Sequence, residues 1–164
     1  MRIFIIGILL ILATVSTAQA KAKHYKQKHA VVRQQPPADA AVCMAQAIYY
    51  EAKHESRIGQ IAVGKVIMNR VHADGYADSV CGVVYERCQF TFTCRRSQNI
   101  DWADNQNLIE LSKQVIAGQY EDVTRGAISF NNKPFKNSGL IKTVKIGNHY
   151  FYRSYARIAG NKEI

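Results

Sequence analysis

Four cysteines constrain what this chain can fold into more than any other feature of its sequence. They are Cys43, Cys81, Cys88 and Cys94. The chain opens with Arg2, an apolar run over residues 3–13 and a small-x-small sequence at 18–20, the pattern of a cleavable secretory signal. Cysteines in a small exported protein pair as disulfides by default. We therefore expect two disulfides that staple one small domain.

Four cysteines allow three pairings, and sequence alone does not choose among them. Cys81 and Cys94 bracket a compact loop, which favours that pair and leaves Cys43 with Cys88. The alternative is a zinc site, but the chain contains no Cys-x2-Cys pair and no His-x3-His pair. We therefore expect no metal ion and no cofactor.

The chain divides into four expected segments. Residues 1–20 form the signal peptide, with an uncleaved membrane anchor as the alternative. Residues 21–37 form a basic linker that cannot bury enough apolar area to fold. Residues 38–156 form the folded domain, and residues 157–164 a C-terminal tail.

Most of the positive charge lies outside the folded domain. Six of the 22 basic residues precede Ala38, so the other 16, set against 12 acids, leave only +4 of the formal +10. The basic linker suits anionic polymers or lipid head groups of the cell envelope, and a merely solvated linker is the alternative. The domain lacks a basic stripe interleaved with aromatic residues, so we expect no nucleic-acid partner.

Apolar periodicity predicts a mainly α fold with minor strands, formally α+β. The first helix covers residues 38–52 with Asp39 as N-cap. The second covers residues 56–71 with Ser56 as N-cap. A third helix covers 104–117 and ends before Gly118. The first two helices form a helical hairpin at the core of the domain.

The rest of the domain is expected to be irregular or extended. Residues 73–102 predict a long, disulfide-stapled loop, within which 89–94 alternate as a short strand or cleft wall would. Two short extended segments follow at 126–131 and 146–152. The sequence does not indicate an oligomeric state.

Glu51 is the strongest candidate for chemistry because it ends the first helix directly after Tyr49 and Tyr50. A carboxylate in a partly dry, tyrosine-lined cleft has a raised pKa, so it stays protonated and can act as a general acid. The alternative is a solvated carboxylate paired with Lys53 or Arg70.

Five blocks of sequence resemble the cell-wall hydrolase family of SleB- and CwlJ-like spore cortex-lytic enzymes. They occur in the family's order over residues 42–152. The blocks read Ala45-x-Ala47-Ile48-Tyr49-x-Glu51-Ala52, Gly59-Gln60-x-Ala62-Val63 with Val66-Ile67-x-Asn69-Arg70-Val71, Val80-Cys81-Gly82-Val83-Val84-Tyr85, Gln89-Phe90-Thr91-Phe92-Thr93 and Ile146-Gly147-x-His149-x-Phe151-Tyr152.

The resemblance implies a lysozyme-like single domain that acts on the glycan strands of peptidoglycan. Such proteins cleave between N-acetylmuramic acid and N-acetylglucosamine, typically as lytic transglycosylases, and their catalytic Glu falls on Glu51. The family usually reads Glu-Ala-Arg-Gly-Glu, where this chain has Lys53, His54 and Glu55 in the last three places. If the Gly serves a left-handed turn, His54 would have to adopt that conformation. This departure bears on rate and cleft shape.

A second carboxylate is hard to find in the sequence. Glu55 is expected to cap the second helix, and Asp101 and Asp104 surround the start of the third. Because the usual glycosidase routes need two carboxylates, a single acid/base that closes a 1,6-anhydro ring is favoured. The alternatives are a hydrolytic muramidase or glucosaminidase on the same fold, and an inactive wall-binding protein. A Cys43–His149 thiol peptidase is a further rival.

Six residues are candidates for binding the glycan. For Gln89, Thr93 and Asn131, the alternative role is to make hydrogen bonds within loops. For Tyr152, the alternative is a place in the core. The candidates are Tyr50, Gln89, Thr93, Asn131, His149 and Tyr152. The expected setting is outside the cytoplasm, in the periplasm or at the cell wall.

Overall fold

The computed structural model describes residues 39–95, 98–136 and 139–155. The expected signal peptide, linker and C-terminal tail lie outside these residues. The elements are α2 (Ala40–Ala52), α3 (Arg57–Val71), α4 (Val80–Tyr85), the 3-10 helices η1 (Glu86–Cys88) and η2 (Thr91–Thr93), α5 (Gln106–Ile116), β1 (Ser129–Asn131), β2 (Leu140–Ile146) and β3 (His149–Ser154). The mainly helical class with a minor sheet is therefore confirmed.

The caps of the helical hairpin follow from the sequence. Asp39 Oδ1 accepts from the backbone N–H groups of Ala41 at 2.7 Å and Val42 at 3.4 Å, at the start of α2. Ser56 Oγ accepts from Gly59 N at 3.4 Å, at the start of α3. Both predicted N-caps are confirmed, because each satisfies backbone donors that the first helical turn leaves free.

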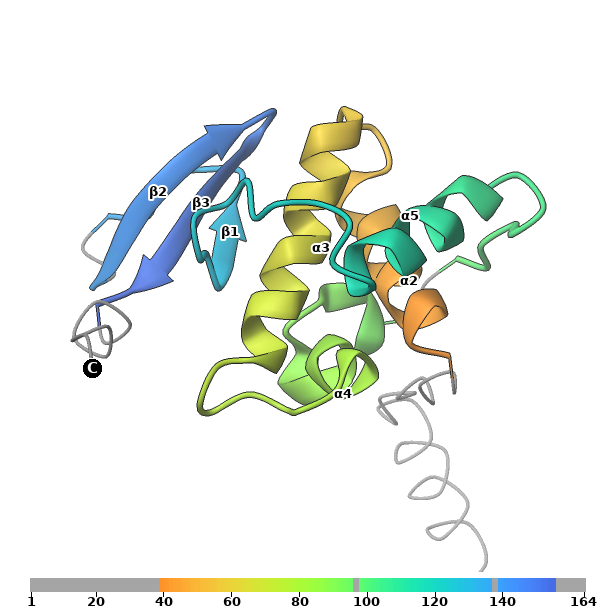
Figure 1. The fold of residues 1–164 in the computed structure, drawn as a ribbon, viewed down its shortest axis with the longest axis horizontal. Coiled ribbons are helices and arrows are strands. Elements are labelled where there is room, and N and C mark those ends of the chain that lie inside the picture. The colour runs from red at the N-terminus through yellow and green to blue at the C-terminus, as the bar shows by residue number, and fades with distance from the viewer. Residues whose placement is uncertain (1–38, 96–97, 137–138, 156–164) are drawn as a thin grey trace, which may run out of the picture. The chain divides into compact units, whose positions relative to one another are not determined.

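Helix α3 lies between the sheet and the helices α2 and α5 (Figure 1). It is therefore apolar on two faces. One face joins the larger core of the helices, through Ile61, Val63 and Ile67. The other packs on the sheet through Ala62 and Val66, which cluster with Ala127 and Phe151.

The three strands form an antiparallel sheet in the order β1–β3–β2. Strand β3 is central and carries the buried residues His149, Phe151 and Tyr152. Strands β1 and β3 lie within or beside the extended segments that the sequence predicts. Strand β2 was not predicted, and it makes a hairpin with β3 through the turn at Gly147 and Asn148. None of the helices in the described residues is both long and apolar enough to cross a membrane.

The predicted long loop is more regular than expected. It contains the short helix α4 and both 3-10 helices. The expectation of a strand at residues 89–94 is wrong, because that segment turns into η2. Local hydrogen bonds of the 3-10 type, such as Thr93 N to Phe90 O at 3.1 Å, replace the ladder of a strand.

Two disulfides form as expected, but the expected pairing is wrong. Cys43 bonds Cys81, and Cys88 bonds Cys94. Helix α4 packs on α2 and brings Cys81 to a Cα–Cα distance of 5.3 Å from Cys43. The tight turns of η1 and η2 bring Cys88 and Cys94 to 5.5 Å. No cysteine is free, so neither the zinc site nor the thiol peptidase has a thiolate to use.

Candidate active site

Glu51 lies in the last turn of α2 and is partly buried. Burial raises the pKa of its carboxyl above the ordinary value. The ion pair that the sequence leaves open does not form. Lys53 Nζ donates to the hydroxyl of Tyr49 at 3.3 Å, and Arg70 Nε donates to the carbonyl of Ile128 at 2.8 Å.

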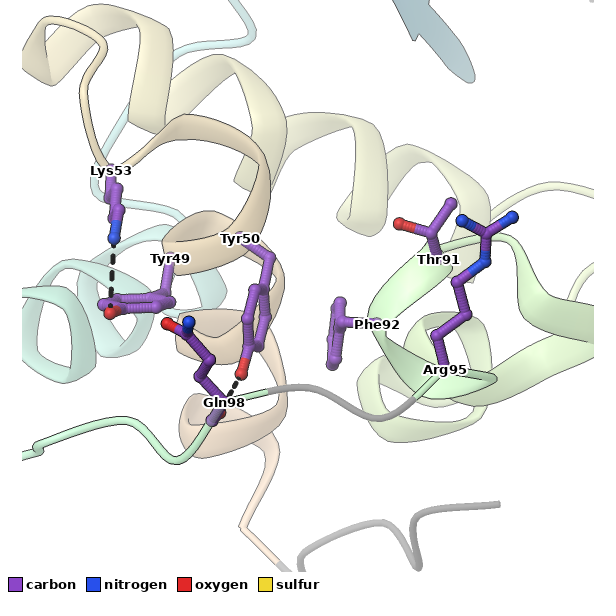
Figure 2. Close-up of a pocket in the computed structure, with 7 residues that line it drawn as sticks. All are labelled: Tyr49, Tyr50, Lys53, Thr91, Phe92, Arg95 and Gln98. Carbon is purple, nitrogen blue, oxygen red and sulfur yellow. Dashed lines mark hydrogen bonds between the residues drawn. The ribbon is translucent and has the colours of Figure 1, made fainter. Parts of the chain in front are cut away.

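An aromatic groove lies between α2 and the segment that begins at η2 (Figure 2), and Glu51 is not among the residues that line it. Its volume is about 340 Å³. It is lined by Tyr49, Tyr50, Lys53, Thr91, Phe92, Arg95 and Gln98. These residues come from α2 and from the segment that begins at η2, which are far apart in sequence and meet because α4 packs on α2.

The rings of the groove hold one another in place. Tyr50 stacks on Phe92 with ring centroids 4.6 Å apart and planes at 20°. Tyr49 meets Tyr50 edge to face at 5.2 Å. The Tyr50 hydroxyl donates to the backbone carbonyl of Gln98. Such a row of fixed rings offers apolar faces with polar rims, a surface that suits sugar rings.

Glu55 has a different role from the one expected. Ser56 caps α3, whereas Glu55 reaches across to the β2–β3 turn. Its carboxylate accepts from Asn148 Nδ2 at 2.8 Å and from Asn148 N at 3.3 Å. A Cβ at Gly147 would lie 1.9 Å from Glu55 Oε2, so a larger residue there would push the Glu55 carboxylate out of its place. Glu55 thus ties the turn after Glu51 to the tip of the hairpin.

The turn between α2 and α3 does not need a left-handed residue at His54. The non-glycine residues with positive φ in the described chain are Arg87, Cys88 and Arg125. His54 is therefore not strained by replacing the family's glycine. The expectation of a left-handed conformation at this position is wrong.

The candidates on the sheet are mostly buried. His149 is 8% exposed, and its ring lies edge-on to Phe130 at a centroid distance of 5.0 Å. Burial lowers its pKa, and the charge of Glu55 partly opposes this. Tyr152 is buried in the core, where its hydroxyl accepts from Phe135 N at 3.0 Å. Asn131 is partly buried at the end of β1.

The candidates in the disulfide-stapled segment, Gln89 and Thr93, do not line the aromatic groove. Thr93 is 2% exposed, and its hydroxyl donates to Phe90 O at 2.8 Å. This geometry favours a structural role for Thr93. Gln89 is exposed and does not line the aromatic groove. Of the six candidates, the groove therefore includes Tyr50 alone.

Sequence reasoning missed most of the groove. The alternation at residues 89–94 indicated a cleft wall, and Thr91 and Phe92 do line the groove. No sequence pattern indicates that Lys53 and Arg95 line the same groove, because that depends on how α4 packs on α2. Asp101 accepts from Ala103 N at 2.9 Å in a local turn, in keeping with its expected structural role. Within the described ranges, His, Cys, Asp and Glu do not gather as a metal site.

Comparison with known proteins gives one family. The family model described as Cell Wall Hydrolase matches residues 54–152, beginning just after Glu51. The spore cortex-lytic enzyme of Halalkalibacterium halodurans is 33% identical over 112 residues, which are 66% of this chain and 33% of that protein. The spore cortex-lytic enzyme of Bacillus subtilis is 44% identical over 112 residues, 66% of this chain and 35% of that protein.

Two solved structures share the fold. The catalytic domain of the Bacillus cereus SleB protein has a TM-score of 0.56 and 25% identity, over 76% of this chain and 97% of that one. The catalytic domain of the germination-specific lytic transglycosylase SleB from Bacillus anthracis has a TM-score of 0.54 and 28% identity, over 71% and 96%. The chain thus spans about a third of those two curated relatives but nearly all of these catalytic domains.

Proposed function

Because this chain belongs to the cell wall hydrolase family, we propose that it cleaves the glycan strands of peptidoglycan outside the cytoplasm. The bond cut is that between N-acetylmuramic acid and N-acetylglucosamine. Glu51 is the acid and then the base of the reaction, and the product carries a 1,6-anhydro-muramic end.

The observation that carries this proposal is the setting of Glu51. Its carboxyl lies in the last turn of α2, is partly buried and has a pKa that burial raises. A carboxyl with a raised pKa keeps its proton to a higher pH than a free carboxyl does, and it can give that proton to the glycosidic oxygen as the bond breaks. Glu51 then accepts the proton of the muramic acid 6-hydroxyl, whose oxygen bonds to C1. The proton balance closes, and no water is consumed.

The other carboxylates support a mechanism with one acid. Both oxygens of Glu55 accept hydrogen bonds from Asn148, and Asp101 is used in a local turn. A hydrolase of the usual kind needs a second free carboxylate beside the bond. The Bacillus anthracis relative is itself named a lytic transglycosylase. Hydrolysis of the same bond is the competing chemistry.

Digestion of purified sacculi tests the proposal. Wild type should release muropeptides with anhydro ends, and Glu51→Gln should lower the rate by about 100-fold or more, as loss of a general acid does. Glu121→Gln, which changes an exposed glutamate, is the matched control and should cut normally. Reducing ends in place of anhydro ends would replace transglycosylation by hydrolysis. If neither wild type nor Glu121→Gln releases muropeptides, the proposal that this protein is an enzyme is wrong.

A further inference from the structure

Charge is divided unevenly between the helices and the sheet. Residues 38–122, which contain the helices, carry 8 basic and 11 acidic side chains. Residues 123–164, which contain the sheet, carry 8 basic side chains and one acid, Glu163. The small positive charge of the domain therefore comes from the sheet region, because the helical region is net negative.

A β-bulge in β2 turns two lysines to the same face of the sheet. Residues three apart in a regular strand point to opposite faces. Between Lys142 and Val144 the register shifts, so β2 advances two residues while β3 advances one. Lys142 is therefore paired with Tyr152. Lys145 is paired with Tyr150, two residues away on β3, so both lysines point to one face. The sequence alone does not show this pairing, because it depends on the bulge.

This outer face of the sheet is the one that the helices leave uncovered. On the opposite face of β3, Phe151 packs with Ala62 of α3. The helices lie on that side of the sheet (Figure 1). On the outer face, the segment after β1 covers Tyr152, whose ring centroid lies 4.8 Å from that of Phe135. Tyr150 stays half-exposed, so a ligand can reach it.

Both lysines lie over the ring of Tyr150. Lys145 Nζ is 5.0 Å and Lys142 Nζ is 5.8 Å from the ring centroid, within the range of a cation–π contact. Both lysines are exposed. The ion pair found among the described residues is elsewhere, between Arg87 and Glu86. Two positive charges held over one ring repel each other, so an anion that binds beside them is attracted by both.

Two further lysines extend this positive surface. Lys133 and Lys136 belong to the segment that covers Tyr152, and both are exposed. That segment is held to the outer face because Phe135 N donates to the Tyr152 hydroxyl at 3.0 Å. Glu55 reaches the sheet at the hairpin turn, where its carboxylate accepts hydrogen bonds, but residues 123–162 contain no acid of their own. This surface, the lysine face, comprises Lys133, Lys136, Lys142, Lys145 and Tyr150.

We propose that the lysine face binds a polymer of the cell envelope that carries phosphate groups along its chain. The proposal goes beyond the proposed function, because this polymer is bound and not cut. A chain with repeated negative charges complements a surface with repeated positive charges. The contact would hold the protein at the wall independently of Glu51.

The chemistry of the face favours a phosphate polymer over two other anionic partners. All four of its cations are lysines, which bind phosphate as point charges, whereas carboxylates are often held by the planar fork of an arginine. The large apolar side chains exposed among the described residues are Ile58 in α3 and Tyr155 after β3. The lysine face thus lacks the set of apolar anchors with which a protein surface enters a membrane.

The test uses a probe that contains no peptidoglycan. Poly(glycerol phosphate) chains are immobilised, and binding of the whole protein is measured at low and high salt. Lys142→Gln combined with Lys145→Gln should weaken binding about tenfold at low salt, as expected for two exposed charge contacts. The difference should shrink at about 1 M salt, where such contacts are screened. The basic linker is present in every variant, so the difference reports the lysine face alone.

Two matched variants control for net charge and for structure. Lys65→Gln combined with Lys113→Gln removes the same charge from α3 and α5 and should bind as wild type does. Lys142→Arg combined with Lys145→Arg keeps the charge of the face and should also bind as wild type does. Equal binding by wild type and the Lys142→Gln, Lys145→Gln protein would overturn the proposal. An equal loss in the α3 and α5 control, or a loss in the arginine variant, would overturn it too.

Two further probes identify the source of the negative charge. Phosphatidylglycerol vesicles present phosphate on a membrane, and polygalacturonate presents carboxylates on a polymer. The two glutamine substitutions in β2 should weaken binding to poly(glycerol phosphate) more than binding to either of these. A larger effect on vesicles would assign the face to a lipid surface, and a larger effect on polygalacturonate to a carboxylate polymer. Either result would overturn the proposal. Cleavage is not measured, so the outcome is independent of the proposed role of Glu51.

Discussion

At the scale of single residues, the burial of Glu51 links activity to stability. Its raised pKa means that the folded protein binds this proton more tightly than the unfolded chain. Such a carboxyl stabilises the fold fully below its unfolded pKa, and this contribution is lost as pH rises through the folded pKa. Glu51→Gln cannot ionise, so we expect it to melt at a higher temperature than wild type at pH 7.

The difference should shrink below about pH 4, where Glu51 is protonated in both the folded and unfolded states. Thermal unfolding at the two pH values measures it. Glu121→Gln, at an exposed site, should show no such pH-dependent gain. A Glu51→Gln protein less stable than wild type at pH 7 would mean that the carboxylate is stabilised by its surroundings.

Residue identities alone predicted the candidate acid but only part of the groove. Tyr50 was a candidate because it precedes Glu51 on the same helix, and it does line the groove, whereas Glu51 does not. Arg95 reaches the groove only through the packing of α4 on α2, which sequence patterns do not encode. The hydroxyl of Thr93 donates to the carbonyl of Phe90, three residues back, which favours a structural role, and the direction of a side chain in a tight turn is not apparent from its type.

At the scale of elements, the hairpin tip and the α2–α3 turn are fitted to each other. Gly147 has φ +55° and would place a Cβ 1.9 Å from Glu55 Oε2. We expect Gly147→Ala to destabilise the fold by about 1–3 kcal/mol, from backbone strain and this clash. In a Glu55→Ala background the clash is gone, so the cost of Gly147→Ala should fall. Urea unfolding of the four proteins of this cycle measures the coupling.

Gly118→Ala provides the matched control for this cycle. Gly118 also has a positive φ, +75°, but nothing lies within 4 Å of an added Cβ. Its substitution should cost backbone strain alone, independent of Glu55. If Gly147→Ala costs the same with and without Glu55, the contact between the turn and the hairpin does not contribute to stability.

Local signals predicted the long elements and missed the short ones. Helices α2 and α3 begin within two residues of prediction because Asp39 and Ser56 are caps that act on adjacent residues. Helix α4 is too short to show a helical period, although Ser79 at its start accepts from Gly82 N at 3.2 Å and is a recognisable cap. Strand β2 has a register shift between Lys142 and Val144, which breaks the alternation that reveals a strand.

At the scale of the whole molecule, the disulfides differ in what they constrain. Cys43–Cys81 closes 38 residues and joins α2 to α4, whereas Cys88–Cys94 closes 6 residues within the turns of η1 and η2. The sequence predicted that all four cysteines pair. The partners followed from the packing of α4, because loop length alone does not decide between pairings.

A disulfide stabilises a fold largely by restricting the unfolded chain, and more so for a longer loop. Replacing Cys43 and Cys81 together with alanine should therefore cost about 4 kcal/mol, and replacing Cys88 and Cys94 about 2 kcal/mol. Because Cys43–Cys81 joins the helix that carries Glu51 to α4, its loss should also lower the rate at which sacculi are cut. Urea unfolding and digestion of purified sacculi measure the two effects. A larger loss of stability from the short disulfide than from the long one would contradict this account, since the local turns rather than the α2–α4 contact would then hold the site together.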